Sequence, residues 1–119
     1  MIQITQIDHV SVLITDIERS RRFYRDLLGL REIAKPRTFS FVALWFELGN
    51  QQLHLLKKPE PDTRSPRHFA LRVVDVSVAR AYMKERGVNV EETTLIPGCD
   101  RFFIHDPDGN RIEIIQWLE

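Results

Sequence analysis

Four side chains that can bind a metal ion stand at matching places in the two halves of the sequence: His9, His54, His68 and Glu113. Neutral imidazole suits Zn, Ni, Fe and Co, and a carboxylate adds hard oxygen character. Four protein ligands on an octahedral ion leave two adjacent positions open, which could take water or a bidentate oxygen substrate. We therefore expect one divalent metal ion, Zn, Ni, Fe, Mn or Co, as the cofactor.

An internal repeat relates these four residues. A shift of 59 residues takes His9 to His68 and His54 to Glu113. Similarity at a fixed spacing is the signature of repeated structural units. The sequence therefore predicts two similar modules, each carrying two of the four candidate ligands.

The first half predicts a strand, a helix and a hairpin. Segment 7–15 is rich in β-branched residues, as strands are. Asp16 follows it as an N-cap, and the apolar residues of segment 17–29 lie largely on one helical face. Segments 39–48 and 52–57 are predicted strands joined by a tight turn.

A linker with three prolines, residues 57–66, separates the two halves. The elements predicted after it follow the order of the first half: a strand at 68–74, a helix at 76–87 capped by Asp75, and strands at 88–93, 101–106 and 111–117. The turn between the last two strands has the sequence DPDG.

Alternation along the last strand of each half places His54 and Glu113 on the face away from the helices. Successive side chains of a strand point to opposite faces of the sheet. The leucines on either side of His54 and the isoleucines on either side of Glu113 would pack against the helices. If two such curved sheets face each other, all four candidate ligands point into one cleft.

Each candidate also has a structural interpretation. A single histidine on a strand is more often a structural residue than a metal ligand. Glu113 is harder to explain in this way, because burying an unpaired carboxylate is costly. Their symmetry-related positions favour the ligand interpretation. The fourth histidine, His105, corresponds to Phe46 under the 59-residue shift and is interpreted as structural or exposed.

The sequence resembles the vicinal oxygen chelate superfamily, which includes glyoxalase I, extradiol ring-cleavage dioxygenases and bleomycin-resistance proteins. The stretches that carry the resemblance are IDHVSVLITDIERSRRFYRDLLGL, QQLHLL, HFALRVVDV and RFFIHDPDGNRIEII. The resemblance implies an α+β fold in which two tandem βαβββ modules form a cupped, mostly antiparallel sheet around a central cleft. The modules would be residues 4–58 and 67–118 of one domain.

The resemblance also implies roles for residues and partners. His9, His54, His68 and Glu113 match the ligand positions of the superfamily. Many members are homodimers, and in some of them each site takes ligands from both subunits. Whether the site lies within one chain or is shared across a dimer stays open.

Two classes of function remain open. The first is a metal-dependent lyase or isomerase of the lactoylglutathione-lyase type, in which the metal chelates an enediolate-like intermediate and Glu113 or a metal-bound hydroxide moves a proton. Within this enzyme class, iron-dependent ring cleavage by His9, His68 and Glu113 is the alternative. The second class is a metal-free protein that binds a small molecule such as an antibiotic. Relatives of that kind generally lack the ligand set, so the four retained positions favour an enzyme.

Two positions depart from the pattern of glyoxalase I. Bacterial forms usually carry Glu where this chain has His54. They also resemble a pattern with Arg four residues after the first histidine, where this chain has Leu13. Arg72 occupies the equivalent place after His68. Our hypothesis is that Arg72 contacts an anionic group of a small-molecule substrate; the alternative is an edge arginine in water.

The bulk composition excludes several other classes. The 17 basic and 17 acidic residues balance, so no basic surface for nucleic acid is expected. No apolar run approaches the ~20 residues of a membrane span. Cys99 is the only cysteine, which excludes an internal disulfide and favours a reducing compartment. No signal peptide is recognised, so the expected location is the cytoplasm.

Overall fold

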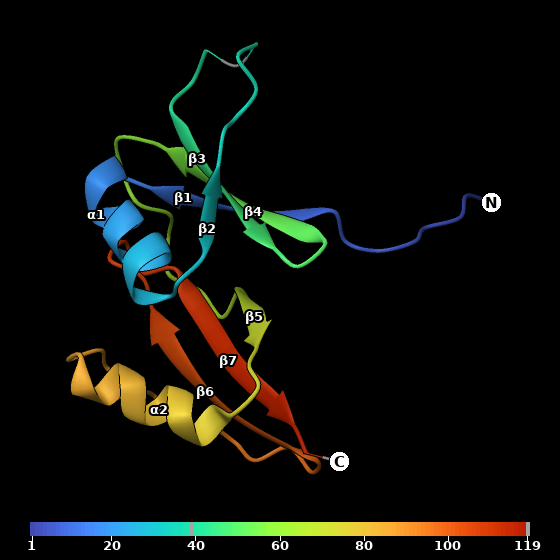
Figure 1. Cartoon of the computed structure of the whole chain (residues 1–119), viewed down its shortest axis with the longest axis vertical. Helices are drawn as coiled ribbons and strands as arrows, with labels where there is room; N and C mark the ends of the chain where they lie inside the picture. The colour runs from blue at the N-terminus through green and yellow to red at the C-terminus, as the bar shows by residue number, and fades with distance from the viewer. Residues whose placement is uncertain (39, 119) are drawn as a thin grey trace. The chain divides into compact units, whose positions relative to one another are not determined.

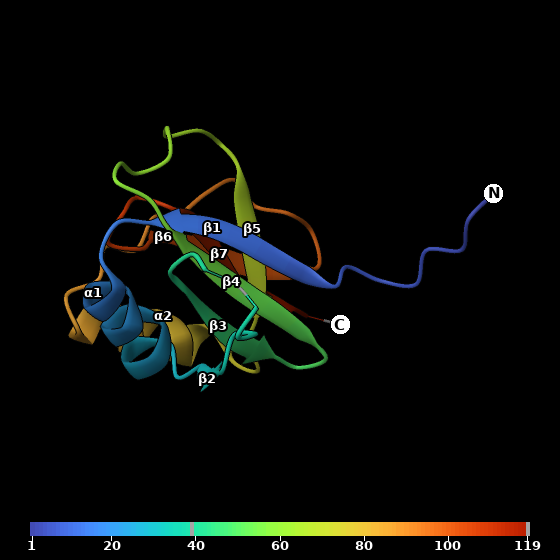
Figure 2. The same cartoon turned by 90° about the horizontal axis from the view of Figure 1, so that it is seen from above.

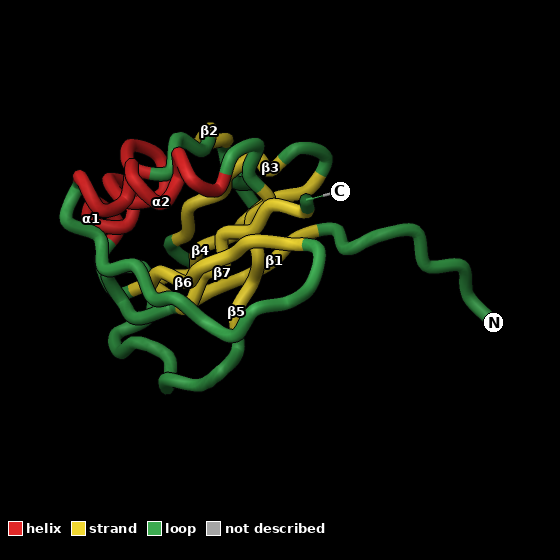
Figure 3. The backbone as a smooth tube through the Cα atoms, turned by 90° about the horizontal axis from the view of Figure 1, so that it is seen from below, coloured by secondary structure: helices red, strands yellow, loops and turns green. Residues whose placement is uncertain are grey.

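The computed structural model describes residues 1–38 and 40–118. The chain divides into two compact units, Met1–Thr63 and Arg64–Glu119. The segment between β4 and β5 is loop, as the linker prediction requires (Figure 3). The α+β class and the two βαβββ-like modules are confirmed. The cupped sheet and the single domain stay predictions.

The first unit is a four-stranded sheet with one helical segment (Figure 1). Its strands have the order β1-β4-β3-β2, and their bounds are β1 (His9–Ile14), β2 (Arg31–Ile33), β3 (Ala43–Leu48) and β4 (Gln51–Lys57). Strand β4 is parallel to β1 and antiparallel to β3, between which it lies (Figure 2). The predicted first helix is divided into an α-helix, α1 (Ile17–Arg21), and a π-helical segment, η1 (Arg22–Leu27).

The second unit is a three-stranded sheet with one α-helix. Its strands have the order β5-β7-β6, and its elements are β5 (His68–Arg72), α2 (Val76–Glu85), β6 (Cys99–His105) and β7 (Arg111–Trp117). Strand β7 is parallel to β5 and antiparallel to β6. The 10-residue α2 is the longest helix described, and no helix in the described part of the chain could span a bilayer.

Strand pairing confirms the internal repeat. In the first unit, His9 lies opposite Gln52 in the parallel β1–β4 pair. In the second unit, His68 lies opposite Arg111 in the parallel β5–β7 pair. Both positions differ by 59 residues, so the first and last strands of the two modules are superimposable in register.

The repeat shift changes to 58 residues in the strand that precedes each last strand. Trp45 lies opposite His54 in the first hairpin, and Phe103 lies opposite Glu113 in the second. The second hairpin has one more residue in its turn, which accounts for the change. The prediction that His105 corresponds to Phe46 is therefore wrong, and its counterpart is the residue after Phe46.

Two strand predictions also need correction. The predicted strand at 88–93 contains only an isolated antiparallel bridge between Glu91 and Phe103. Its counterpart in the first unit is a true strand, β2, which the sequence analysis did not predict. The strand predicted at 39–48 begins at Ala43, and Phe39 lies outside the described residues.

Both predicted N-caps are confirmed. The Asp16 carboxylate accepts a hydrogen bond from the backbone N–H three residues later, at 2.9 Å. The Asp75 carboxylate accepts from the N–H groups two and three residues later, at 3.0 and 3.1 Å. Gly29 and Gly87 follow the helical segments with φ of +76° and +75°, a region that favours glycine.

Apolar side chains fill the space between each sheet and its helix. The fully buried ones in the first unit include Ile14, Tyr24, Phe46, Leu53 and Leu55. Those at most 2% exposed in the second unit include Val76, Phe102, Ile104, Ile112 and Ile114. The residues that flank His54 and Glu113 are thus buried as predicted. Alternation then turns His54 and Glu113 to the opposite face of each sheet.

An arginine ties the helix to the sheet in both units. Arg21 donates to Glu32 at 2.8 Å. Arg80, its repeat counterpart, donates to Glu92 at 2.8 Å and to Asp100 at 2.9 Å. The Arg80 guanidinium holds the pKa of Asp100 below its usual value. These ion pairs recur in both modules and so belong to their common framework.

We expect Asp75→Ala to lower the free energy of unfolding by about 1 kcal/mol, because two backbone N–H groups lose their acceptor. Asp75→Asn should lose much less, since the side-chain carbonyl can still accept. Urea unfolding followed by circular dichroism measures both variants. Equal losses in the two variants would mean that charge, not capping, carries the effect.

Candidate metal centre

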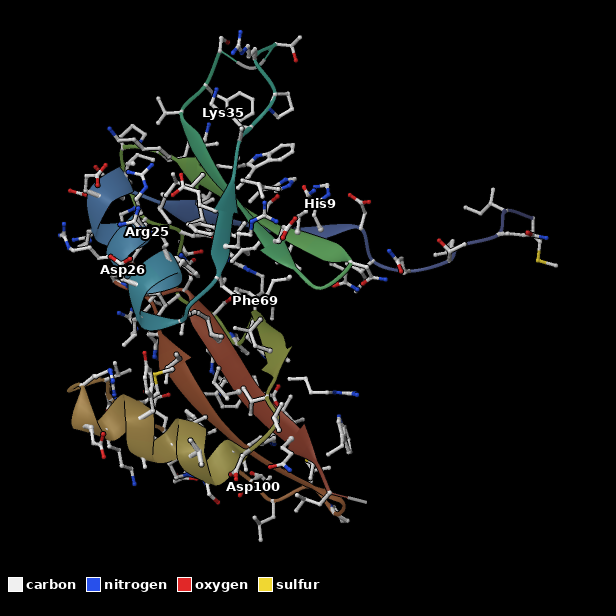
Figure 4. The ribbon with its side chains drawn as sticks, in the orientation of Figure 1. His9, Arg25, Asp26, Lys35, Phe69 and Asp100 are labelled. Carbon is white, nitrogen blue, oxygen red and sulfur yellow. The ribbon has the colours of Figure 1, made fainter. Side chains whose placement is uncertain are left out.

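The two candidate ligands of the first unit lie against each other on neighbouring strands. His9 stands at the start of β1 (Figure 4), and His54 lies near the middle of β4. Their ring centroids are 4.2 Å apart, with 24° between the ring planes. Trp45 of β3 stacks on His54 with a centroid separation of 3.7 Å and an angle of 7°. The three rings form a column across β1, β4 and β3.

The hydrogen bond at His9 fixes a tautomer suited to metal binding. Nδ1 lies 2.9 Å from the Asp8 carboxylate, which can only accept a hydrogen bond when ionised. In the neutral ring the proton is therefore on Nδ1, and the lone pair is on Nε2. Histidines that bind metals commonly donate their other N–H to a carboxylate in this way.

His54 is held in a different way. Its Nε2 lies 2.8 Å from Oε1 of Gln52, on the same strand. Burial lowers the pKa of His54, and the nearby His9 lowers it further, against a smaller opposing effect of Asp8. The neutral imidazole that a metal requires is thus favoured. For Nε2 to bind an ion, Gln52 would have to turn away; otherwise Nδ1 would be the ligand atom.

The two candidate ligands of the second unit are in direct contact. Nε2 of His68 lies 3.0 Å from Oε1 of Glu113, and Nδ1 of His68 lies 2.9 Å from the backbone carbonyl oxygen of Pro66. Both neighbours of the ring are acceptors, but a neutral imidazole has only one N–H. With Nδ1–H donated to Pro66, the contact between Nε2 and Glu113 is favourable only if a positive species lies there, either a proton or a metal ion.

Arg101 completes the surroundings of Glu113. Its Nη1 donates to Oε2 of Glu113 at 3.2 Å, so the two carboxylate oxygens have different partners. The Glu113 side chain is 8% exposed and that of Arg101 is 15% exposed. The aromatic ring of Phe103 lies beside them, in T-shaped contact with His68 at 4.9 Å. The carboxylate is therefore buried but paired.

The sequence analysis missed Arg101 and Asp8. Arg101 lies opposite Ile115 and therefore shares a sheet face with Glu113. This could be found by counting back across the DPDG hairpin, provided that the length of its turn were known. The signal at Asp8 was a carboxylate directly before a candidate ligand.

Within each unit the structure brings the predicted pair together, and we call these pairs the two half-sites: His9 with His54, and His68 with Glu113. Each unit is described by itself, and in residues 1–38 and 40–118 no group of three or more His, Cys, Asp or Glu side chains gathers as a metal cluster would. Arg72 ends β5 in an exposed position on the face of His68. Its contact with a substrate stays a prediction.

A family model described as the Glyoxalase/Bleomycin resistance protein/Dioxygenase superfamily matches residues 6–114. The chain belongs to this superfamily. Among curated relatives, it is 29% identical over 124 residues to Glyoxylase I 4 of Arabidopsis thaliana, which covers 95% of this chain and 71% of the relative. The resemblance found in the sequence is thus confirmed at the level of the superfamily.

Solved structures of the superfamily agree with this assignment. A glyoxalase family protein from Bacillus anthracis is 30% identical, with a TM-score of 0.91 over 98% of both chains. TnmS3, an antibiotic-binding protein from Streptomyces sp. CB03234, is 28% identical, with a TM-score of 0.82 over 98% of this chain and 99% of that one. Enzyme-named and binding relatives are therefore similar to this chain to a comparable degree.

The lowered pKa of His54 predicts a pH dependence of stability in protein freed of metal with a chelator. Between the folded pKa and the ordinary value of 6.5, the unfolded chain binds more protons. The free energy of unfolding should therefore rise with pH across this window and level off above it. Comparison with His54→Gln, unfolded in urea at each pH, isolates the contribution. A wild type and variant with parallel pH profiles would contradict it.

Proposed function

We propose that the protein is a divalent-metal-dependent lyase or isomerase of the glyoxalase type that acts on a small molecule with vicinal oxygens. The observation that carries the proposal is the contact between His68 and Glu113. Nε2 and Oε1 are 3.0 Å apart. Two ligand atoms at adjacent octahedral positions, each ~2.1 Å from an ion, are separated by about the same distance. The pair therefore fits two neighbouring ligands of one metal ion.

The complete ligand set would join the two half-sites. His9 and His54 would supply neutral nitrogen ligands, and His68 and Glu113 would supply a nitrogen and an oxygen. They would meet either within one chain or across a homodimer. When bound, the ion would supply positive charge that stabilises the oxygens of the substrate.

The protein's own groups have separate tasks in this proposal. Glu113 would move a proton on the substrate, as a positioned carboxylate does in general acid–base catalysis. Arg72 would bind an anionic substrate group. The buried free thiol of Cys99 suits a reducing compartment, so we propose the cytoplasm as the location.

A metal-free binding protein is the second candidate. The ring column of His9, His54 and Trp45 supports it, because in this arrangement the imidazoles stack instead of converging on a point. The similarity to TnmS3 also supports it. The metal content of the purified protein separates the two candidates.

Elemental analysis of the purified protein should find about one divalent metal ion per chain, and Glu113→Ala should lose it, because the carboxylate contributes the charged ligand. His105→Asn is the matched control: it removes the one histidine outside the proposed set and should keep the metal. Circular dichroism verifies the fold of each variant. Wild-type protein that stays metal-free after soaking with Fe, Ni, Mn, Co and Zn would favour the binding protein.

The metal-loaded protein should isomerise the hemithioacetal formed from a 2-oxoaldehyde and glutathione, measured as formation of the thioester. Arg72→Gln should raise KM with little change in kcat, since it removes binding of an anionic group that does not react. Oxygen consumption with a catechol, and no thioester, would instead assign the Fe(II) extradiol reaction.

A further inference from the structure

We propose that Arg101 is a positioning residue that holds the Glu113 carboxylate so that only one of its oxygens is offered to the metal ion. This inference rests on the proposed function and adds a residue that neither the sequence pattern nor the family assignment supplies. Its consequence is a vacant ligand position for the second oxygen of a chelating substrate.

The first argument is the division of the carboxylate between two partners. Oε2 accepts a hydrogen bond from Nη1 of Arg101 at 3.2 Å, and Oε1 faces Nε2 of His68 at 3.0 Å. Rotation of the carboxylate would break both contacts. Hydrogen bonds to ligating carboxylates orient them toward a metal in this way.

The second argument is the anchoring of Arg101 itself. Its Nη2 donates to the backbone carbonyl oxygen of Thr94 at 2.9 Å, in the loop that precedes β6. The guanidinium therefore has one arm on Glu113 and one on the backbone. A side chain held at both ends loses little further freedom when it orients a neighbour, because its rotamer is already fixed.

The third argument is the contrast between the two modules. Under the 58-residue relation of the third strands, Arg101 corresponds to Ala43, and the ligand that it holds corresponds to His54. The ion pairs of Arg21 and Arg80 recur in both modules, but this arginine does not. A guanidinium is present where the candidate ligand is a carboxylate and absent where it is an imidazole. The Arg101–Glu113 pair therefore belongs to the site and not to the common framework.

A carboxylate whose Oε2 is occupied by Arg101 binds an ion through Oε1 alone. A carboxylate free to rotate could bind through both oxygens and take one more coordination position. By preventing this, Arg101 would keep two adjacent positions for a substrate that binds through two oxygens. The substrate class that fits is a bidentate oxygen chelator, such as an α-hydroxycarbonyl compound or its enediolate.

The test is the affinity of apo-protein for Zn²⁺ or Ni²⁺, measured by competition with a chromophoric chelator. Arg101→Gln should weaken binding by about 10- to 100-fold, the effect typical of removing a residue that orients a ligand. Arg86→Gln is the matched control: it removes an arginine that lies over Tyr82 on α2 and should leave the affinity unchanged. Thermal unfolding of each apo-protein measures any structural effect separately.

The direction of the change discriminates between roles. If Arg101 were only a nearby positive charge, its removal would strengthen the binding of a dication. If it were only structural, unfolding would occur at lower temperature while the metal affinity stayed the same. Either result would overturn the proposal.

Two further variants show whether Arg101 acts through Glu113. In the Glu113→Gln background, Arg101→Gln should have no additional effect on metal affinity; an additional loss would contradict the proposal. Arg101→Lys should remain weakened, because one ammonium cannot replace two guanidinium arms, and full recovery would overturn the two-armed geometry. Wild-type protein that binds no metal would refute the proposed function and this inference together, whereas wild-type binding that Arg101→Gln leaves intact would refute this inference alone.

Discussion

Parallel pairing between the first and last strands of each module is the constraint on which the candidate site depends. It sets His9 beside the strand of His54, and His68 beside the strand of Glu113, with the same register in both modules. A slip of one residue would turn every side chain of a strand to the other face. The leucines and isoleucines that pack against the helices prevent such a slip, since it would expose them. The hydrophobic core of each unit thus fixes the direction in which the candidate ligands point.

The same backbone carries two different ways of stabilising a polar group. In the first unit, His54 is covered by rings, and burial makes its neutral form more favourable. In the second unit, Glu113 keeps its charge and is paired with Arg101 and His68. Removing one partner of a buried ion pair typically costs about 3–5 kcal/mol, because the other charge is left uncompensated. A carboxylate could replace an imidazole after duplication only together with a cation beside it, and Ala43 against Arg101 is the corresponding difference.

Local patterns predicted the parts of the structure that depend on neighbouring residues. The caps at Asp16 and Asp75 and the buried faces of β4 and β7 follow from spacing alone. The weak second strand of the second module did not, because only Glu91 of segment 88–93 pairs with β6. The pair Arg101–Glu113 was missed for a related reason. It joins residues across a hairpin, and one additional residue in the DPDG turn changes which residues face each other.

The donor set has an electrostatic consequence that links the two modules. In the proposed site, three neutral imidazoles leave the charge of a divalent ion unchanged, and Glu113 reduces it by one. Arg101 sits on the far oxygen of that carboxylate and offsets its charge. The site as a whole therefore keeps a net positive charge, which favours a substrate that becomes anionic on its oxygens during the reaction. A glutamate in place of His54, the usual residue in bacterial glyoxalase I, would remove one more unit of that charge. The histidine thus makes this centre more electrophilic and less able to accept a proton, which puts a larger share of proton transfer on Glu113.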